Sequence, residues 1–75
     1  MHMTYSPDVD AAYVYFRPIQ PGEVTEQRVI KLKSPRSEHD LVFDLTSKGE
    51  LVGFEVLDAS LLFSEQVLND AIRQE

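Results

Sequence analysis

A chain of 75 residues without cysteine is long enough for one domain, and it has neither disulfides nor thiolate zinc sites to stabilise it. The formal net charge of −6 argues against a protein that binds nucleic acid over its whole surface, because such binding depends on basic residues that displace counterions from phosphates. A domain this small buries only about 60% of the surface that its unfolded chain exposes, so we expect association to add stability. No stretch is long enough to span a membrane, and the lack of cysteine favours the cytoplasm.

The first half of the chain predicts three strands. Residues 3–5 form a short strand, and Pro7 among small acidic residues favours a turn after it. Residues 11–17 are apolar on both faces, which predicts a central position in a sheet. After a break rich in proline and glycine, residues 24–32 predict a third strand, and residues 33–40 predict a polar loop.

The next part of the chain predicts a β-hairpin. Apolar residues alternate with other residues over 41–45 and again over 51–57. The segment between them contains Ser47, Lys48 and Gly49, which is typical of a tight turn with the glycine at positive φ. Lys48 stands where a calcium-binding loop needs a ligand oxygen, so this segment is interpreted as a turn and not as a metal site.

The end of the chain predicts one amphipathic helix over residues 64–74. Ser64 is a typical N-cap, and the apolar residues at one helical face are Val67, Leu68, Ala71 and Ile72. The elements together predict one α+β domain over residues 3–75, with a small, meander-like antiparallel sheet of about five strands and the helix on one face. Met1 and His2 are interpreted as a short extension that precedes the domain.

A single helix can cover only one face of this sheet. Residues 11–17 and 51–57 are apolar on both faces, so the second face is expected to meet another copy of the chain. The sequence therefore predicts a homodimer. The candidate interface residues are Tyr13, Tyr15, Leu51, Gly53, Glu55 and Leu57.

Four of the seven basic residues fall within nine positions, and they are Arg28, Lys31, Lys33 and Arg36. One interpretation is a strip that binds a polyanion or an acidic partner. The other is an edge strand whose lysines discourage unwanted pairing. The absence of interleaved aromatic residues favours the second interpretation.

Few residues are candidates for chemistry. Glu55 lies inside an apolar strand and needs water or a cation such as Arg17, Arg28 or Lys31. A single carboxylate without a nucleophile is not a mechanism, so a structural role is favoured. His39 is alone in a polar segment and is expected to be solvated. We therefore expect no catalytic residue, no cofactor and no metal.

The chain resembles a family of small bacterial proteins known as domain of unknown function 2283. The resemblance lies in the segment Tyr5-Ser-Pro-Asp-Val-Asp-Ala-Ala-Tyr-Val-Tyr15, in Phe43-Asp44, and in Gly49-Glu-Leu-Val-Gly-Phe-Glu-Val-Leu-Asp-Ala-Ser60, and it extends into the final helix. It implies a compact antiparallel sheet with a helix, in bacteria where such genes sometimes neighbour small toxin-like proteins. It implies no activity and no cofactor.

Three functional hypotheses follow. The first is a homo-oligomeric protein-interaction domain without catalysis. The second is an antitoxin-like partner or regulator, whose acidic surface would bind a basic toxin. The third is a small enzyme that uses Glu55 and Asp58.

Overall fold

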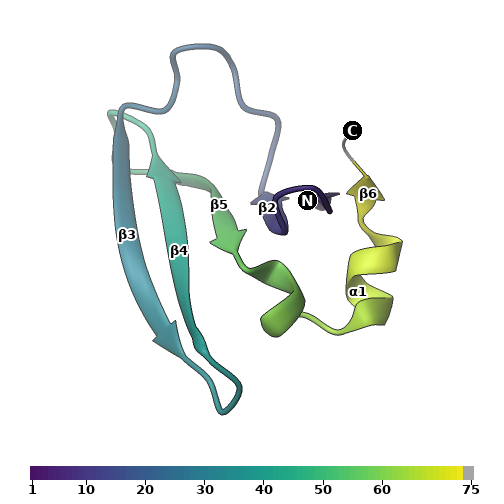
Figure 1. Ribbon diagram of the computed structural model, residues 1–75. Helices are drawn as coiled ribbons and strands as arrows, with labels where there is room; N and C mark the ends of the chain where they lie inside the picture. Colours follow the sequence, from purple (N-terminus) through teal and green to yellow (C-terminus); the bar gives the residue numbers. More distant parts are fainter. Residues whose placement is uncertain (74–75) are drawn as a thin grey trace.

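The computed structural model describes residues 1–73, which form one sheet with two short helices beside it (Figure 1). The elements in chain order are β1 (His2–Ser6), β2 (Ala11–Tyr15), β3 (Glu26–Lys33), β4 (Glu38–Leu45), β5 (Leu51–Leu57), the 3-10 helix η1 (Ala59–Leu61), α1 (Glu65–Asp70) and β6 (Ile72–Arg73). Five strands are antiparallel, so the predicted α+β class is confirmed. His2, which the sequence placed in an extension, is the first residue of β1.

The strand order in the sheet is β3-β4-β5-β2-β1-β6. The strands β3, β4 and β5 form the predicted meander, but β2 pairs with β5 and not with β3. The chain therefore crosses from the middle of the sheet to its far edge through residues 16–25. Within this connection Arg17 forms an ion pair with Glu23. The hydrogen bonds that the Glu23 carboxylate accepts from Arg17 and from the Gln20 amide lower the pKa of Glu23 to about 2. The central position of β2 agrees with its apolar side chains on both faces.

The predicted turn before β5 is confirmed, because Gly49 has a φ of 79°. The predicted loop over residues 33–40 is wrong, because β3 continues to Lys33 and β4 begins at Glu38. A tight turn joins them, in which the Ser34 amide donates to the Ser37 carbonyl at 2.9 Å. Of the residues that predicted a loop, 34–37 form this turn, whereas Lys33, Glu38, His39 and Asp40 are strand residues that pair across the hairpin.

Helix α1 begins where the sequence predicted and ends earlier. The Ser64 hydroxyl accepts a hydrogen bond from the Val67 amide at 3.2 Å, which confirms the N-cap. The helix ends at Asp70, because Ala71 is extended and the chain then pairs with β1 as the parallel strand β6. The prediction of a helix over 64–74 was wrong beyond residue 70, since apolar spacing did not reveal this backbone pairing. Residue 74 itself lies outside the described residues.

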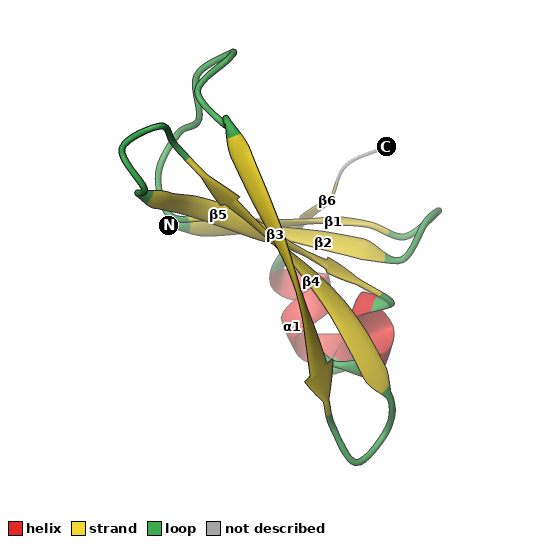
Figure 2. Cartoon of the chain, turned by 90° about the vertical axis from the view of Figure 1, so that its left-hand side faces the viewer, coloured by secondary structure: helices red, strands yellow, loops and turns green. Residues whose placement is uncertain are grey.

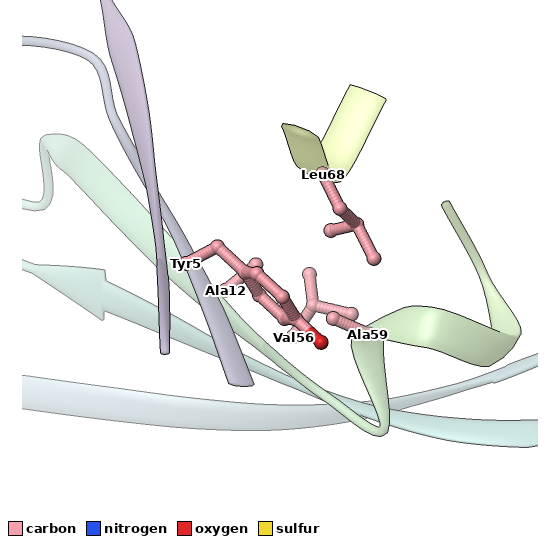
Figure 3. Packing of buried hydrophobic residues seen from close by; sticks show 5 residues of the cluster. All are labelled: Tyr5, Ala12, Val56, Ala59 and Leu68. Atoms are coloured by element: carbon pink, nitrogen blue, oxygen red, sulfur yellow. The ribbon is translucent and has the colours of Figure 1, made fainter. Parts of the chain in front are cut away.

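The buried core lies where β1, β2 and β5 meet the two helices. Figure 3 shows Leu68 pointing from α1 toward Tyr5, Ala12 and Val56 of the sheet, with Ala59 beside them. Partly buried side chains surround this cluster, and they are Met3, Leu41, Phe54, Leu62, Phe63 and Ala71. The apolar core is therefore small and is confined to one side of the sheet.

A glycine is required in the middle of β5. A Cβ at Gly53 would lie 2.6 Å from Cε1 of Tyr13 and 2.6 Å from the carbonyl oxygen of Val14. The Tyr13 ring lies over Gly53, and its hydroxyl donates to the Asp44 carboxylate on β4 at 2.6 Å. The missing side chain at Gly53 thus lets Tyr13 cross β5 and reach Asp44.

We predict that Gly53→Ala lowers the free energy of unfolding by about 1–3 kcal/mol, because the backbone contact with Val14 cannot be relieved by a side-chain rotation. Urea unfolding monitored by circular dichroism measures the loss. Gly22→Ala is the comparison, since Gly22 has open space around it but, unlike Gly53, has a positive φ, of 75°, so its variant carries backbone strain without a steric clash. An unchanged free energy of unfolding for Gly53→Ala would contradict the assigned packing.

Candidate functional site

The two faces of the sheet follow from its register, because residues paired across neighbouring strands point to the same side. One row crosses the sheet through Ile30, Leu41, Val56, Ala12 and Tyr5. This row lies under the helices, and we call its side the helix face. The neighbouring row points to the opposite side, the open face, and consists of Val29, Val42, Glu55, Tyr13 and Thr4.

The open face is held together by polar contacts. Asp44 is buried, and its two carboxylate oxygens accept from the Tyr13 hydroxyl at 2.6 Å and from the Gln27 amide group at 2.8 Å. Burial of the ring, together with the hydrogen bond to Asp44 and its charge, raises the pKa of Tyr13. The sequence interpretation missed this contact. In the register of the sheet, Gly53 pairs with Asp44 of β4 and lies diagonally across from Tyr13, which pairs with Glu55.

The six candidate interface residues do not form a continuous apolar surface. Gly53 is covered by the Tyr13 ring, and Leu51 lies beyond a β-bulge that interrupts the alternation. Tyr15 packs against the Tyr13 ring, with centroids 4.5 Å apart, and stacks on His2. Leu57 is the partly exposed aliphatic residue of this set on the open face. Tyr13 and Tyr15 thus contact each other, His2 and Asp44 within the chain, and the role of the six residues in an interface between copies stays a prediction.

Glu55 is half-buried on the open face. Within residues 1–73, no hydrogen bond or ion pair of its side chain is found, and the cations expected to pair with it bind other carboxylates. Arg17 pairs with Glu23, Arg28 with Glu26, and Lys31 with Asp40. Asp58, its suggested catalytic partner, is exposed in a left-handed turn after β5. The described contacts do not join these two carboxylates.

The basic segment lies on β3, at the edge of the sheet. Arg28 belongs to the helix face, whereas Lys31 and Lys33 belong to the open face. The Lys31 ammonium group lies 2.8 Å from Asp40, which raises the pKa of Lys31, and that of Lys33 lies 4.0 Å from Glu38. Arg36 lies in the turn after β3. The four side chains are thus not gathered into one basic strip.

An exposed apolar area lies on the helix face, over β3, β4 and β5. We call it the helix-side apolar surface, and its residues are Phe16, Ile30, Leu32, Phe43 and Phe54. Ile30 is 49% exposed, Leu32 40% and Phe16 37%. The Phe54 ring stacks on Phe43, with centroids 5.1 Å apart, and packs against Phe16 at 5.9 Å. In Figure 1 the helices stand at the opposite side of the molecule from β3, and Figure 2, viewed from the β3 side, shows them behind β3 and β4.

His39 is buried at the end of this face, although the sequence predicted that it is solvated. Its ring is 1% exposed, and Nε2 lies 3.2 Å from the Ser34 hydroxyl. Nδ1 has no hydrogen-bond partner within the described part of the chain. The prediction failed because His39 is a strand residue opposite Leu32 and not part of a loop.

Asp10 joins two distant parts of the chain. Its carboxylate accepts from the Tyr5 hydroxyl at 2.7 Å, and from the hydroxyl and the amide of Ser60 at 2.6 and 3.0 Å. Burial alone would raise the pKa of Asp10, but these hydrogen bonds outweigh it and lower the pKa. A cavity of about 450 Å³ lies beside this contact, between the first turn and α1, and Arg36 lines its far side.

A family model described as "Protein of unknown function (DUF2283)" matches residues 2–60. The chain belongs to the DUF2283 family. The match covers β1 to β5 and both ends of the Asp10–Ser60 contact, but it stops before α1 and does not extend into the helix as the resemblance suggested. No curated protein and no solved structure matches the chain.

The described helices of this DUF2283 protein are too short and too polar to cross a membrane. Some of its charged side chains form exposed ion pairs along β3 and β4 and in the segment after β2, and Asp10 forms the contact with Ser60. Within residues 1–73, no group of three histidine or acidic side chains lies close enough together to hold a metal ion. The candidate functional site is therefore a surface, made of the helix-side apolar surface and the neighbouring edge strand.

For this DUF2283 fold we predict that Asp10→Asn lowers the free energy of unfolding near neutral pH by about 1–3 kcal/mol, because charge-assisted hydrogen bonds to Tyr5 and Ser60 are lost. Folding lowers the pKa of Asp10 below its ordinary value of 3.8. The contribution of Asp10 to the free energy of unfolding is therefore fully present above pH 3.8, and it is lost as the pH falls through the lower pKa of the folded state. The difference between wild type and variant should thus shrink in acid. Urea unfolding over a pH series measures it, with Asp8→Asn in the same turn as the control for charge. A difference that stays constant in acid would contradict the assignment.

Proposed function

We propose that this protein is an interaction domain without catalysis and that it functions as a homodimer. The observation that carries the proposal is the helix-side apolar surface, in which aromatic and aliphatic side chains lie exposed beside one another. Scattered exposed apolar residues are ordinary on proteins, but a contiguous group of them is typical of a site of contact with another molecule.

The burial along one row of the helix face supports this proposal. Val56, Ala12 and Tyr5 are buried beneath the helices, with exposed fractions of 0%, 1% and 8%. Further along the same row Leu41 is half-buried, and Ile30 is 49% exposed. The apolar row thus continues past the part of the sheet that the helices cover. A second copy placed against this end would remove the apolar area of side chains such as Ile30 from water at about 25 cal/mol per Å².

A basic protein partner is the second candidate, and the net charge of −6 favours it. Such a partner would correspond to the antitoxin-like role that the family resemblance suggested. For both functions we propose a bacterial cytoplasm as the setting, in line with that resemblance and with the lack of cysteine. The homodimer ranks first because it is supported by a defined surface, whereas charge alone supports the second candidate.

We predict a dimer of the wild-type chain by light scattering and by sedimentation at several concentrations. Ile30→Lys should weaken association about tenfold or more, equivalent to about 1.4 kcal/mol, because it places a charge in the apolar contact. Val9→Lys is the matched control, since it makes the same change at a residue of the first turn that is 71% exposed. Circular dichroism confirms that both variants are folded. A wild-type monomer at all concentrations, or equal effects of the two substitutions, would contradict the proposal.

A further inference from the structure

Strand β3 offers a long, unpaired backbone edge. All eight of its residues are exposed, and among the described residues only β4 pairs with it. The opposite side of the sheet differs, because β6 pairs with part of β1 there. Edge strands carry unsatisfied N–H and C=O groups that can bind a strand of another chain, and proteins usually protect long edges from this.

The usual protection of an edge is charge, and on β3 the charges are neutralised within the chain. Lys31 pairs with Asp40 and Lys33 with Glu38, while Arg28 pairs with Glu26 on the same strand. The basic side chains of β3 therefore present less net charge to an approaching strand than the sequence alone suggests. Two apolar residues, Val29 and Ile30, lie in the middle of the strand and are 64% and 49% exposed.

We infer that the second copy binds at this edge, with β3 antiparallel to β3 of the partner and Ile30 beside the twofold axis. This inference rests on the proposed homodimer and specifies its contact. The two six-stranded sheets would then form one continuous sheet of twelve strands, and the helices of both copies would lie on the same side of it.

Charge restricts the register of such a pair. A twofold axis perpendicular to the sheet sets one residue of β3 opposite the same residue of the partner, because antiparallel partners share a face. A register centred on Arg28 would oppose two guanidinium groups, and one centred on Lys31 would oppose two ammonium groups. Like charges directly opposite each other are destabilising. Registers centred on the uncharged residues Gln27, Val29, Ile30 or Leu32 avoid these central repulsions, and those centred on Val29 or Ile30, in the middle of β3, pair the most residues.

The helix face favours the register centred on Ile30. In that register Ile30 meets Ile30 of the partner, and Leu32 of each copy lies diagonally next to this pair, so four exposed apolar side chains cluster. Arg28 of the partner lies opposite Leu32 in this register and opposite Ile30 in the register centred on Val29, so only the first of the two sets the isoleucines directly opposite each other. The Ile30 register also makes the helix-side apolar surfaces of the two copies continuous across the axis.

The absence of cysteine from the chain allows a direct test with single cysteines. Ile30→Cys should form an intermolecular disulfide rapidly under mild oxidation, because directly opposed Cβ atoms lie about 4.5–5.5 Å apart, close to disulfide geometry. Val29→Cys is the matched control, one residue away and more exposed. In the inferred register its Cβ would lie about 7–8 Å from its copy, so it should cross-link several-fold more slowly. Non-reducing electrophoresis of the dimer measures both rates.

The outcomes separate this inference from the proposed function. Fast cross-linking of Ile30→Cys and slow cross-linking of Val29→Cys supports the inferred contact. Equal or faster cross-linking of Val29→Cys, or no cross-linking of either variant in a chain that sediments as a dimer, overturns the inferred contact and leaves the homodimer standing. A chain that sediments as a monomer overturns both.

Discussion

The six-residue helix α1 packs a single buried side chain, Leu68, into the core, and this short contact decides which part of the sheet is protected from water. The helix ends because the chain after it turns into β6 and pairs with β1. Leu68 and the neighbouring Ala59 therefore cover β1, β2 and β5, and on β4 they reach only the partly buried Leu41. The strands β3 and β4 extend beyond this cover, and the exposure of Ile30 and Leu32 follows from that geometry.

The open face does not need the same cover, because its aromatic residues are occupied within the chain. Tyr13 would be an apolar residue by its alternation along β2, yet its hydroxyl binds the buried Asp44. Gly53 supplies the space for that ring. The apolar side chains of β2 are therefore covered in two different ways. On the helix face they lie under the helices, and on the open face the Tyr13 ring packs over Gly53.

The local signals of the sequence predicted much of this fold. The hairpin of β4 and β5, the turn at Gly49, the cap at Ser64 and the central position of β2 each depend on residues close together in the chain. Contacts between distant residues were not predictable in the same way. Asp10 and Ser60 are 50 positions apart, and the burial of His39 depends on a hairpin whose polar composition is typical of a loop. The candidate surface was missed for the same reason, since periodicity assigns a side chain to a face but does not say how far a helix covers that face.

The position of the proposed contact relative to the family match is also informative. Residues 2–60 contain β3, the helix-side apolar surface and the Asp10–Ser60 contact, whereas α1 and β6 lie outside the match. A chain limited to the matched region would keep the exposed β3 edge and would lose both Leu68 from the core and the strand that pairs with β1. The C-terminal segment therefore closes one edge of the sheet and one part of its apolar face. Because that segment does not reach β3, the unpaired edge of β3 and the helix-side apolar surface lie next to each other. One twofold contact between two β3 strands therefore pairs this edge and also brings the helix-side apolar surfaces of the two copies together.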